Sequence, residues 1–183
     1  CPIIARQSRT VFSMPPEEPV LNPPKPKVKP IVKNIPLKID IKGVGGQQLK
    51  DQWLDGPRSY LGLMVSGFPN MFTVTGPGSP SVLCNMPPAI EHHVEWITDC
   101  IAHLRKQGIQ RIEADDKAAD GWVLEVNEAA NSTLLPSATH SWYLGANVPG
   151  KPRVFMPYAG GFAKYRKIVE ERTRSGFQGF RLT

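Results

Sequence analysis

Residues 71–93 read MFTVTGPGSPSVLCNMPPAIEHH, and this stretch decides how the surrounding chain folds. It predicts a short strand (Met71–Val74), a loop rich in Gly, Pro and Ser (Thr75–Leu83), and a helix that begins near Asn85. A strand that runs through such a turn into a helix can hold a phosphate-bearing or electron-rich cofactor. Free backbone N–H groups in the loop and the positive end of the helix would both face the ligand.

The same stretch lacks the more specific phosphate-binding motifs. GPGSP is neither the G-x-G-x-x-G dinucleotide motif nor a P-loop, since no Lys-Ser/Thr follows its second glycine. Asn85 is a good N-cap, and the prolines at 87 and 88 fit the first turn of a helix, where a missing N–H costs nothing. Taken alone, these residues favour a plain strand-to-helix turn over a ligand site.

The composition is that of a globular chain with a basic balance. The 183 residues are 40% hydrophobic and 21% charged, with a net charge of +6 and a pI near 9.3. This charge raises nucleic acid or an anionic cofactor as partners. The basic residues are scattered, however, and no aromatic-basic interleaving or nucleic-acid-binding module is present in the sequence. We therefore predict no nucleic-acid partner.

Cysteine and histidine usage indicates a reducing, cytoplasmic compartment and no metal site. Cys1, Cys84 and Cys100 are too few and too far apart for a disulfide framework. Cys84, His92, His93 and Cys100 lack the paired C-x-x-C or H-x-x-x-H spacing of a zinc site, which favours a buried thiol and surface imidazoles. No apolar run approaches the ~20 residues that span a bilayer, so we predict no membrane partner.

Two parts of the chain differ in composition. Residues 1–36 are interrupted by prolines and carry a PKPKVKP tract, which predicts an extended linker or a segment laid along another surface. A proline-rich recognition ligand is the alternative interpretation. Residues 37–183 have the composition of a folded domain.

Within residues 37–183 the patterns predict alternating strands and helices. We expect a strand over 37–41, a short helix over 47–54, and a long helix ending before Gly108. The apolar stripe of the long helix would be its core face, and it contains Ile90, Val94, Ile97, Ile101 and Leu104.

The second half of the chain continues in the same way. A helix over 115–134 would turn Trp122 and Val126 inward, and a long loop follows over 136–152. Trp142 in that loop is either a core residue or one that closes over a ligand. We further predict a strand over 153–158, a basic helix over 162–173 and a final strand within 177–182.

Three stretches resemble the C-terminal part of Baeyer–Villiger flavin monooxygenases, the family typified by cyclohexanone and phenylacetone monooxygenase. They are Gly56–Pro69 (GPRSYLGLMVSGFP), Asn70–Trp96 and Ser141–Gly161 (SWYLGANVPGKPRVFMPYAGG). The resemblance implies an α/β fold that is part of a two-dinucleotide-domain flavoprotein. It also implies FAD and NADP(H) as cofactors, and the conversion of a ketone with O₂ to an ester or lactone.

The resemblance also implies roles for individual residues. The positions that match the flavin-facing loop and helix are Gly76, Gly78, Cys84, Asn85 and Met86, with the Met86 N–H at the pyrimidine edge of FAD. The positions that match the NADP neighbourhood are Trp142 and Lys151. The positions that match the substrate pocket are Ser81, Val82, Leu83, Phe155 and Met156.

Several features of that family are absent from this sequence. It contains neither of the two G-x-G-x-x-G turns nor the F-x-G-x-x-x-H-x-x-x-W signature, and no residue matches the catalytic Arg. We therefore expect no catalytic residue here, and a polypeptide that is incomplete and inactive without N-terminal FAD and NADP domains. The alternative is a non-catalytic truncated remnant that acts as an interaction module through residues 1–36.

Overall fold

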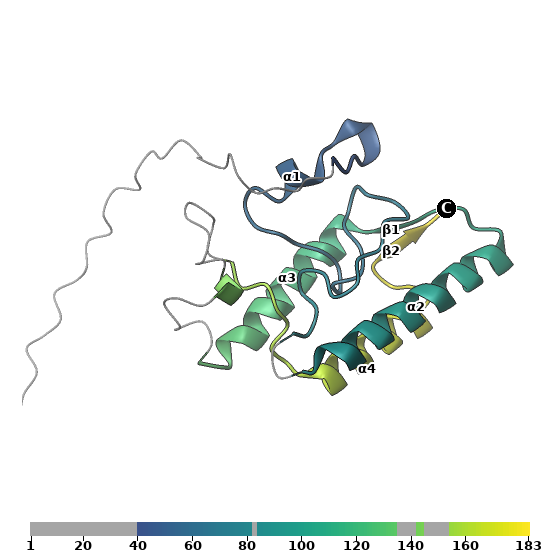
Figure 1. Cartoon of the computed structure of the whole chain (residues 1–183). Helices are drawn as coiled ribbons and strands as arrows, with labels where there is room; N and C mark the ends of the chain where they lie inside the picture. The colour runs from purple at the N-terminus through teal and green to yellow at the C-terminus, as the bar shows by residue number, and fades with distance from the viewer. Residues whose placement is uncertain (1–39, 82–83, 135–141, 145–153) are drawn as a thin grey trace, which may run out of the picture.

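The computed structural model describes residues 40–81, 84–134, 142–144 and 154–183 (Figure 1). Three helices form most of the structure: α2 (Met86–Gln107), α3 (Asp116–Asn131) and α4 (Phe162–Arg174). The shorter elements are η1 (Val44–Gly46), α1 (Leu49–Gln52), β1 (Ile112–Ala114), η3 (Trp142–Leu144) and β2 (Phe180–Leu182). The predicted proline-rich segment, residues 1–36, lies outside the described residues.

Helices α2 and α4 lie side by side, and the C-terminal end of each leads into a strand of a small sheet (Figure 1). Trp96 of α2 donates its indole N–H to the hydroxyl of Thr173 on α4 at 2.8 Å. Strands β1 and β2 pair in antiparallel fashion, with Ile112 opposite Leu182. This pairing brings the end of the chain back against the residues that follow α2.

The core is centred on a turn-rich segment, residues 60–65, rather than on a sheet. Its apolar side chains are at most 2% exposed. Tyr60, Leu61, Leu63 and Met64 share a cluster with residues of the three long helices, whereas Val65 packs with Leu49 and Phe68. Two tyrosine hydroxyl groups link this segment to the rest of the protein. Tyr60 donates a hydrogen bond to the carbonyl of Gln178 at 2.9 Å, and Tyr165 of α4 donates one to the carbonyl of Leu61 at 2.6 Å. These two hydrogen bonds thus pair polar groups that the buried coil would otherwise leave without a partner in the interior.

The predicted core face of α2 is confirmed at Leu104, which is buried, and at Ile97, which packs against the core, but it is wrong in the first half of the helix. Ile90 and Val94 are 40% and 48% exposed. The residues that α2 buries are Ala89, His93, Trp96, Cys100 and Leu104. These positions also repeat at steps of three and four, so the helical period allowed both faces. The prediction of surface imidazoles is wrong at His93, which is fully buried.

The predicted end of α2 and the predicted start of α3 are confirmed. Gly108 ends α2 in the left-handed conformation (φ 71°), as a C-terminal glycine does. Asp115 caps α3 by accepting hydrogen bonds from the backbone of Lys117 and Ala118. Gly121 lies within the continuous helix α3, and Trp122 and Val126 are buried as predicted.

Two predicted strands are absent from the described residues. Residues 71–74 form only an isolated bridge, between Met64 and Phe72, and residues 154–158 form no strand. Their backbone groups bond to turns instead: the Thr73 N–H to Leu63 and the Tyr158 N–H to Ser79. In the predicted 37–41 strand, residues 40–41 are also irregular, and the rest lies outside the described residues. The final strand is confirmed as β2, and the fold mixes helices and strands as expected.

Candidate functional site

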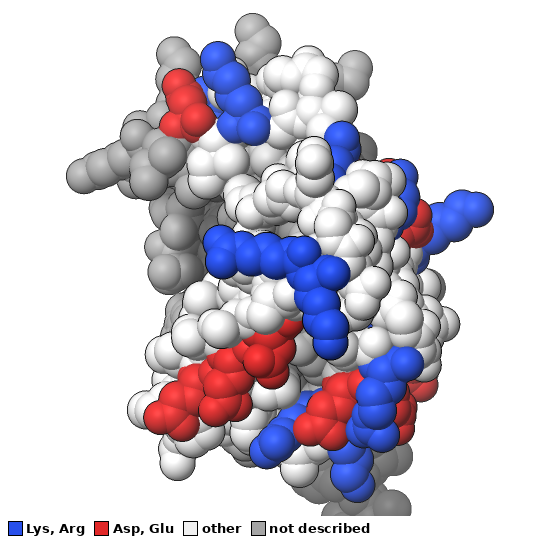
Figure 2. Space-filling model, turned by 90° about the vertical axis from the view of Figure 1, so that its right-hand side faces the viewer, with Lys and Arg blue, Asp and Glu red and all other residues white. Residues whose placement is uncertain are grey.

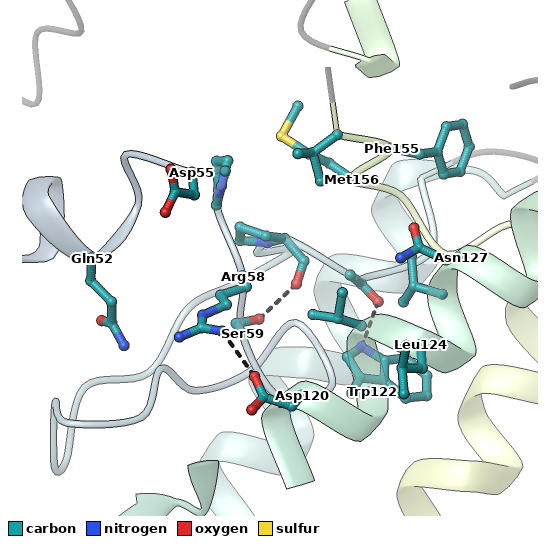
Figure 3. A pocket seen from close by; sticks show the side chains of 17 residues that line it. Gln52, Asp55, Arg58, Ser59, Asp120, Trp122, Leu124, Asn127, Phe155 and Met156 are labelled. Carbon is teal, nitrogen blue, oxygen red and sulfur yellow. Dashed lines mark hydrogen bonds and ion pairs between the residues drawn. The ribbon is translucent and has the colours of Figure 1, made fainter. Parts of the chain in front are cut away.

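A cavity of about 530 Å³ lies where α1, α3 and the glycine-rich loop meet (Figure 3). It brings together segments that are far apart in the sequence. The lining side chains and backbone come from Gln52, Asp55, Gly56, Pro57, Arg58, Ser59, Pro77, Gly78, Asp120, Trp122, Val123, Leu124, Val126, Asn127, Val154, Phe155 and Met156. Three of the predicted site residues, Gly78, Phe155 and Met156, therefore share one wall.

One side of the cavity is polar. Arg58 forms an ion pair with Asp120 at 2.8 Å, and Ser59 donates its hydroxyl to the carbonyl of Pro77 at 2.6 Å. Both contacts are visible in Figure 3. Because Arg58 and Asp120 are each about half exposed, their pairing contributes little to stability but leaves charged groups at the rim.

The opposite side is apolar and is built on Trp122. The indole ring stacks on Tyr158 with ring centroids 5.2 Å apart, and its N–H donates to the carbonyl of Gly78 at 3.1 Å. Phe155 is buried, and Met156 is half-buried beside it. An apolar wall facing a few polar groups is the usual make-up of a small-molecule site.

The expectation that the glycine-rich loop offers free N–H groups is wrong at several positions. Thr75 donates its N–H to His93, Gly76 to Gly62, Gly78 to Met156 and Ser79 to Gly76. These N–H groups are already used in hydrogen bonds within the protein, so the loop cannot bind a phosphate through them. Its contribution is to support the residues on either side.

The beginning of α2 is the part of this region that is left open. Asn85 stands at the N-cap, but its side chain makes no capping hydrogen bond, and the first turn holds no acidic residue. Pro87 and Pro88 have no N–H, and among the described residues none accepts a hydrogen bond from the Met86 N–H. Met86 is 39% exposed. The positive end of this long helix is therefore exposed, and its first N–H has no acceptor within the described part of the chain.

The other predicted site residues lie close to this helix start or outside the described residues. Cys84 is half-buried, its thiol lies 3.1 Å from the carbonyl oxygen of Asn85, and burial raises its pKa, which keeps it protonated near neutral pH. Ser81 is half-buried. Val82, Leu83 and Lys151 lie outside the described residues, and for Trp142 the structure describes the backbone, in η3.

The structure thus groups the predicted residues in two places. Gly78, Phe155 and Met156 line the cavity, whereas Asn85 and Met86 lie at the start of α2 and are not part of its lining. Sequence reasoning missed Ser59 and Asn127, which line the cavity. No sequence pattern identifies these two residues. Ser59 reaches the cavity from the turn before residue 60, and Asn127 reaches it from α3, so only the packing of these segments brings them together.

Charged side chains of both signs are mixed over the described surface, and on the face shown in Figure 2 basic side chains lie beside acidic ones. Glu113 pairs with both Arg111 and Arg181, and Arg172 pairs with Glu125. The described part of the chain holds no group of three His, Cys, Asp or Glu side chains arranged for a metal ion, and none of its helices could cross a membrane.

Solved structures identify the class of protein to which this fold belongs. The chain superposes on cyclohexanone monooxygenase from Rhodococcus sp. Phi1 bound to NADP⁺ with a TM-score of 0.76 and 38% identity, over 80% of this chain and 27% of that one. It superposes on an oxidised steroid monooxygenase bound to NADP with a TM-score of 0.72 and 50% identity, over 79% and 26% of the two chains. The fold is that of a segment of these monooxygenases.

The sequence comparison narrows the class. The chain is 43% identical over 147 residues to acetone monooxygenase (methyl acetate-forming) from Gordonia sp. strain TY-5, and 40% identical over 144 residues to cyclohexanone 1,2-monooxygenase from Acinetobacter sp.. It is thus homologous to a segment of the Baeyer–Villiger monooxygenases, and it spans about a quarter of their length (27% and 26%). No protein-family model matches the sequence.

Proposed function

We propose that this chain is part of an FAD- and NADP(H)-dependent Baeyer–Villiger monooxygenase that converts ketones to esters or lactones with O₂. The observation that carries the proposal is the match at 38–50% identity to solved monooxygenases over four fifths of the chain. Two of the matched proteins are described as FAD-binding or as a complex with FAD and NADP. FAD, when bound, would supply the redox chemistry that uses NADPH and O₂.

The start of α2 fits such a flavin. The negative charge that collects on the pyrimidine edge of a reduced flavin would be stabilised by the Met86 N–H and by the helix dipole. The two prolines leave this single N–H donor in the first turn, and the absence of acidic residues there avoids repulsion. Cys84, Asn85 and the Gly76–Gly78 loop would hold this helix start against the ring.

The remaining assignments place substrate and NADP on the neighbouring residues. Phe155, Met156 and Ser81, with Val82 and Leu83, would form the apolar side of the ketone site, where they exclude water. Trp142 and Lys151 would contact NADP. The nucleotide-binding motifs and the catalytic Arg would come from N-terminal domains, which makes those domains the principal partner.

The test is a chimera in which residues 37–183 replace the matching segment of the Gordonia acetone monooxygenase. We expect the chimera to hold FAD and to form an ester from a ketone with consumption of NADPH. A folded chimera without flavin would refute the proposal. One that holds flavin and consumes NADPH but forms no ester would retain the cofactors and refute the ketone reaction.

A single substitution tests the role of Met86. Met86→Pro removes the N–H, and the methionine side chain with it, but should leave the helix intact. Proline is accepted at the first helical position, and Asn85 already has the extended backbone (φ −73°, ψ 136°) that precedes proline. We expect it to lower the flavin reduction potential of the chimera, since the reduced, negatively charged form loses a hydrogen bond. Met86→Leu keeps the N–H and should leave the potential unchanged.

A further inference from the structure

His93 is a buried histidine that the proposed function does not use. It lies on α2 with 0% of its surface exposed. Its Nδ1 accepts a hydrogen bond from the Thr75 N–H at 3.0 Å, and its Nε2 lies 2.7 Å from the hydroxyl oxygen of Tyr165 on α4. Since Nδ1 accepts, the proton of the neutral ring is on Nε2 and is donated to Tyr165, whose own proton goes to the carbonyl of Leu61.

This pair of side chains holds two backbone positions that are costly to form. Leu61 and Thr75 are both non-glycine residues with left-handed backbone, with φ of 56° and 50°. The Thr75 N–H bonds to His93, and the Leu61 carbonyl bonds to Tyr165. A single His–Tyr contact therefore joins the two turns.

The joined turns determine where the glycine-rich loop lies. Directly after Leu61, the carbonyl of Gly62 accepts the Gly76 N–H at 3.1 Å and the hydroxyl of Thr73 at 2.8 Å. Two residues further on, the Gly78 N–H reaches the carbonyl of Met156 at 2.7 Å. The loop is thus fixed from its first residue to the wall of the cavity.

We propose that His93 is a positioning residue which, together with Tyr165, holds residues 75–81 in the conformation that leads into the start of α2. The imidazole must be neutral to do so, because a protonated Nδ1 cannot accept from the Thr75 N–H. The consequence for flavin binding rests on the function proposed above, whereas the positioning itself can be measured without a cofactor.

The surroundings of His93 make this contact sensitive to acid. Among the described residues, the titratable groups that face it are His92 from α2 and Tyr165 from α4, and the loop contributes backbone. Burial lowers the pKa of His93 to about 4, the charge of His92 adds to this, and a backbone contact with Thr73 opposes it. Burial raises the pKa of Tyr165, so that residue remains a donor.

The experiment compares amide hydrogen exchange in the full chain and in two conservative variants. In His93→Asn the side-chain oxygen occupies roughly the place of Nδ1 and can still accept from Thr75, whereas in His93→Gln the amide reaches toward Tyr165 and leaves Thr75 without an acceptor. We expect His93→Gln to lower the protection of the Thr75 amide by about tenfold and His93→Asn to retain it. The Val126 amide in α3 serves as an internal reference.

Two measurements on the wild-type chain test the proposal even if a variant does not fold. The ¹⁵N chemical shifts of His93 should report an unprotonated Nδ1 at neutral pH, and the protection of Thr75 should fall as the pH falls from 6.5 toward 4. His93→Asn should lose that pH dependence. An Nδ1-protonated ring, or equal Thr75 protection in both variants, would overturn the proposal. If these results hold while the chimera binds no flavin, the positioning stands and the proposed function fails.

Discussion

At the scale of single residues, the glycines of the loop are explained by the protein's own packing. A side chain at Gly76 would meet the Thr73 hydroxyl at 2.5 Å, and one at Gly78 would meet the Trp122 indole nitrogen at 2.7 Å. Gly78 also has a positive φ of 84°. Glycine at these positions allows the loop to approach the core closely, and this requirement exists with or without a ligand.

Gly78→Ala should destabilise the chain by about 2–4 kcal/mol, because a strained backbone and a clash with Trp122 add together. Gly108→Ala is the matched control: it has a similar φ of 71° but nothing within 4 Å of the added carbon. It should cost about 1 kcal/mol. Urea unfolding measures both free energies, and equal losses would show that the contact with Trp122 does not matter.

At the scale of elements, α2 shows that a helical pattern can allow two faces. The face of α2 that contains Ile90 and Val94 is more hydrophobic than the face that contains His93 and Cys100, yet the second face is the one that is buried. Trp96 lies on this buried face, and its indole N–H donates a hydrogen bond to Thr173 of α4. The partner helix therefore selects the face, and helix periodicity cannot report that choice.

Neighbouring positions on α2 provide a direct test of the buried face. Ala89→Gln should destabilise the chain by about 2–3 kcal/mol, because a larger polar group is forced into a site that is 0% exposed. Ile90→Gln should cost less than about 1 kcal/mol, since Ile90 is 40% exposed. Thermal and urea unfolding would measure both, and the reverse order would support the face expected from sequence.

At the scale of the whole molecule, Glu113 connects three distant parts of the chain. Its carboxylate accepts from the Gly67 N–H at 3.0 Å, from Arg181 at 3.1 Å and from Arg111 at 2.6 Å. Burial acts to raise the pKa of Glu113, but these hydrogen bonds and charges outweigh it and lower the pKa from its ordinary value of 4.5. The ionised form thus stabilises the fold.

Glu113→Gln should destabilise the chain by about 1–3 kcal/mol at neutral pH, because charge-assisted hydrogen bonds are lost from a buried site. Since the folded-state pKa is the lower one, the contribution is present above pH 4.5 and is lost as the pH falls through the folded-state pKa. The variant should therefore lose part of the acid sensitivity of unfolding. Glu170→Gln, which removes a carboxylate from exposed pairs on α4, should change stability little; similar losses in both would argue against a special role for Glu113.

The sequence by itself determined what depends on neighbouring residues. Prolines after Asn85 and a glycine at 108 set the two ends of α2, and the Asp115 side chain caps α3 with its own next turn. Such signals act within a few residues, so they can be recognised without knowing the fold. The family motifs were equally local, and the comparisons confirm the resemblance that they carry.

The tertiary structure alone decided what depends on residues far apart in the chain. Pairing of β1 with β2, the burial of His93 and the cavity between the loop and Trp122 all require contacts across more than 40 residues. The backbone N–H groups of the glycine-rich loop were expected to be free. In the structure, the N–H groups of Gly76 and Gly78 donate hydrogen bonds to the carbonyls of Gly62 and Met156. A backbone N–H looks the same in any sequence, and its partner is known only once the chain has packed.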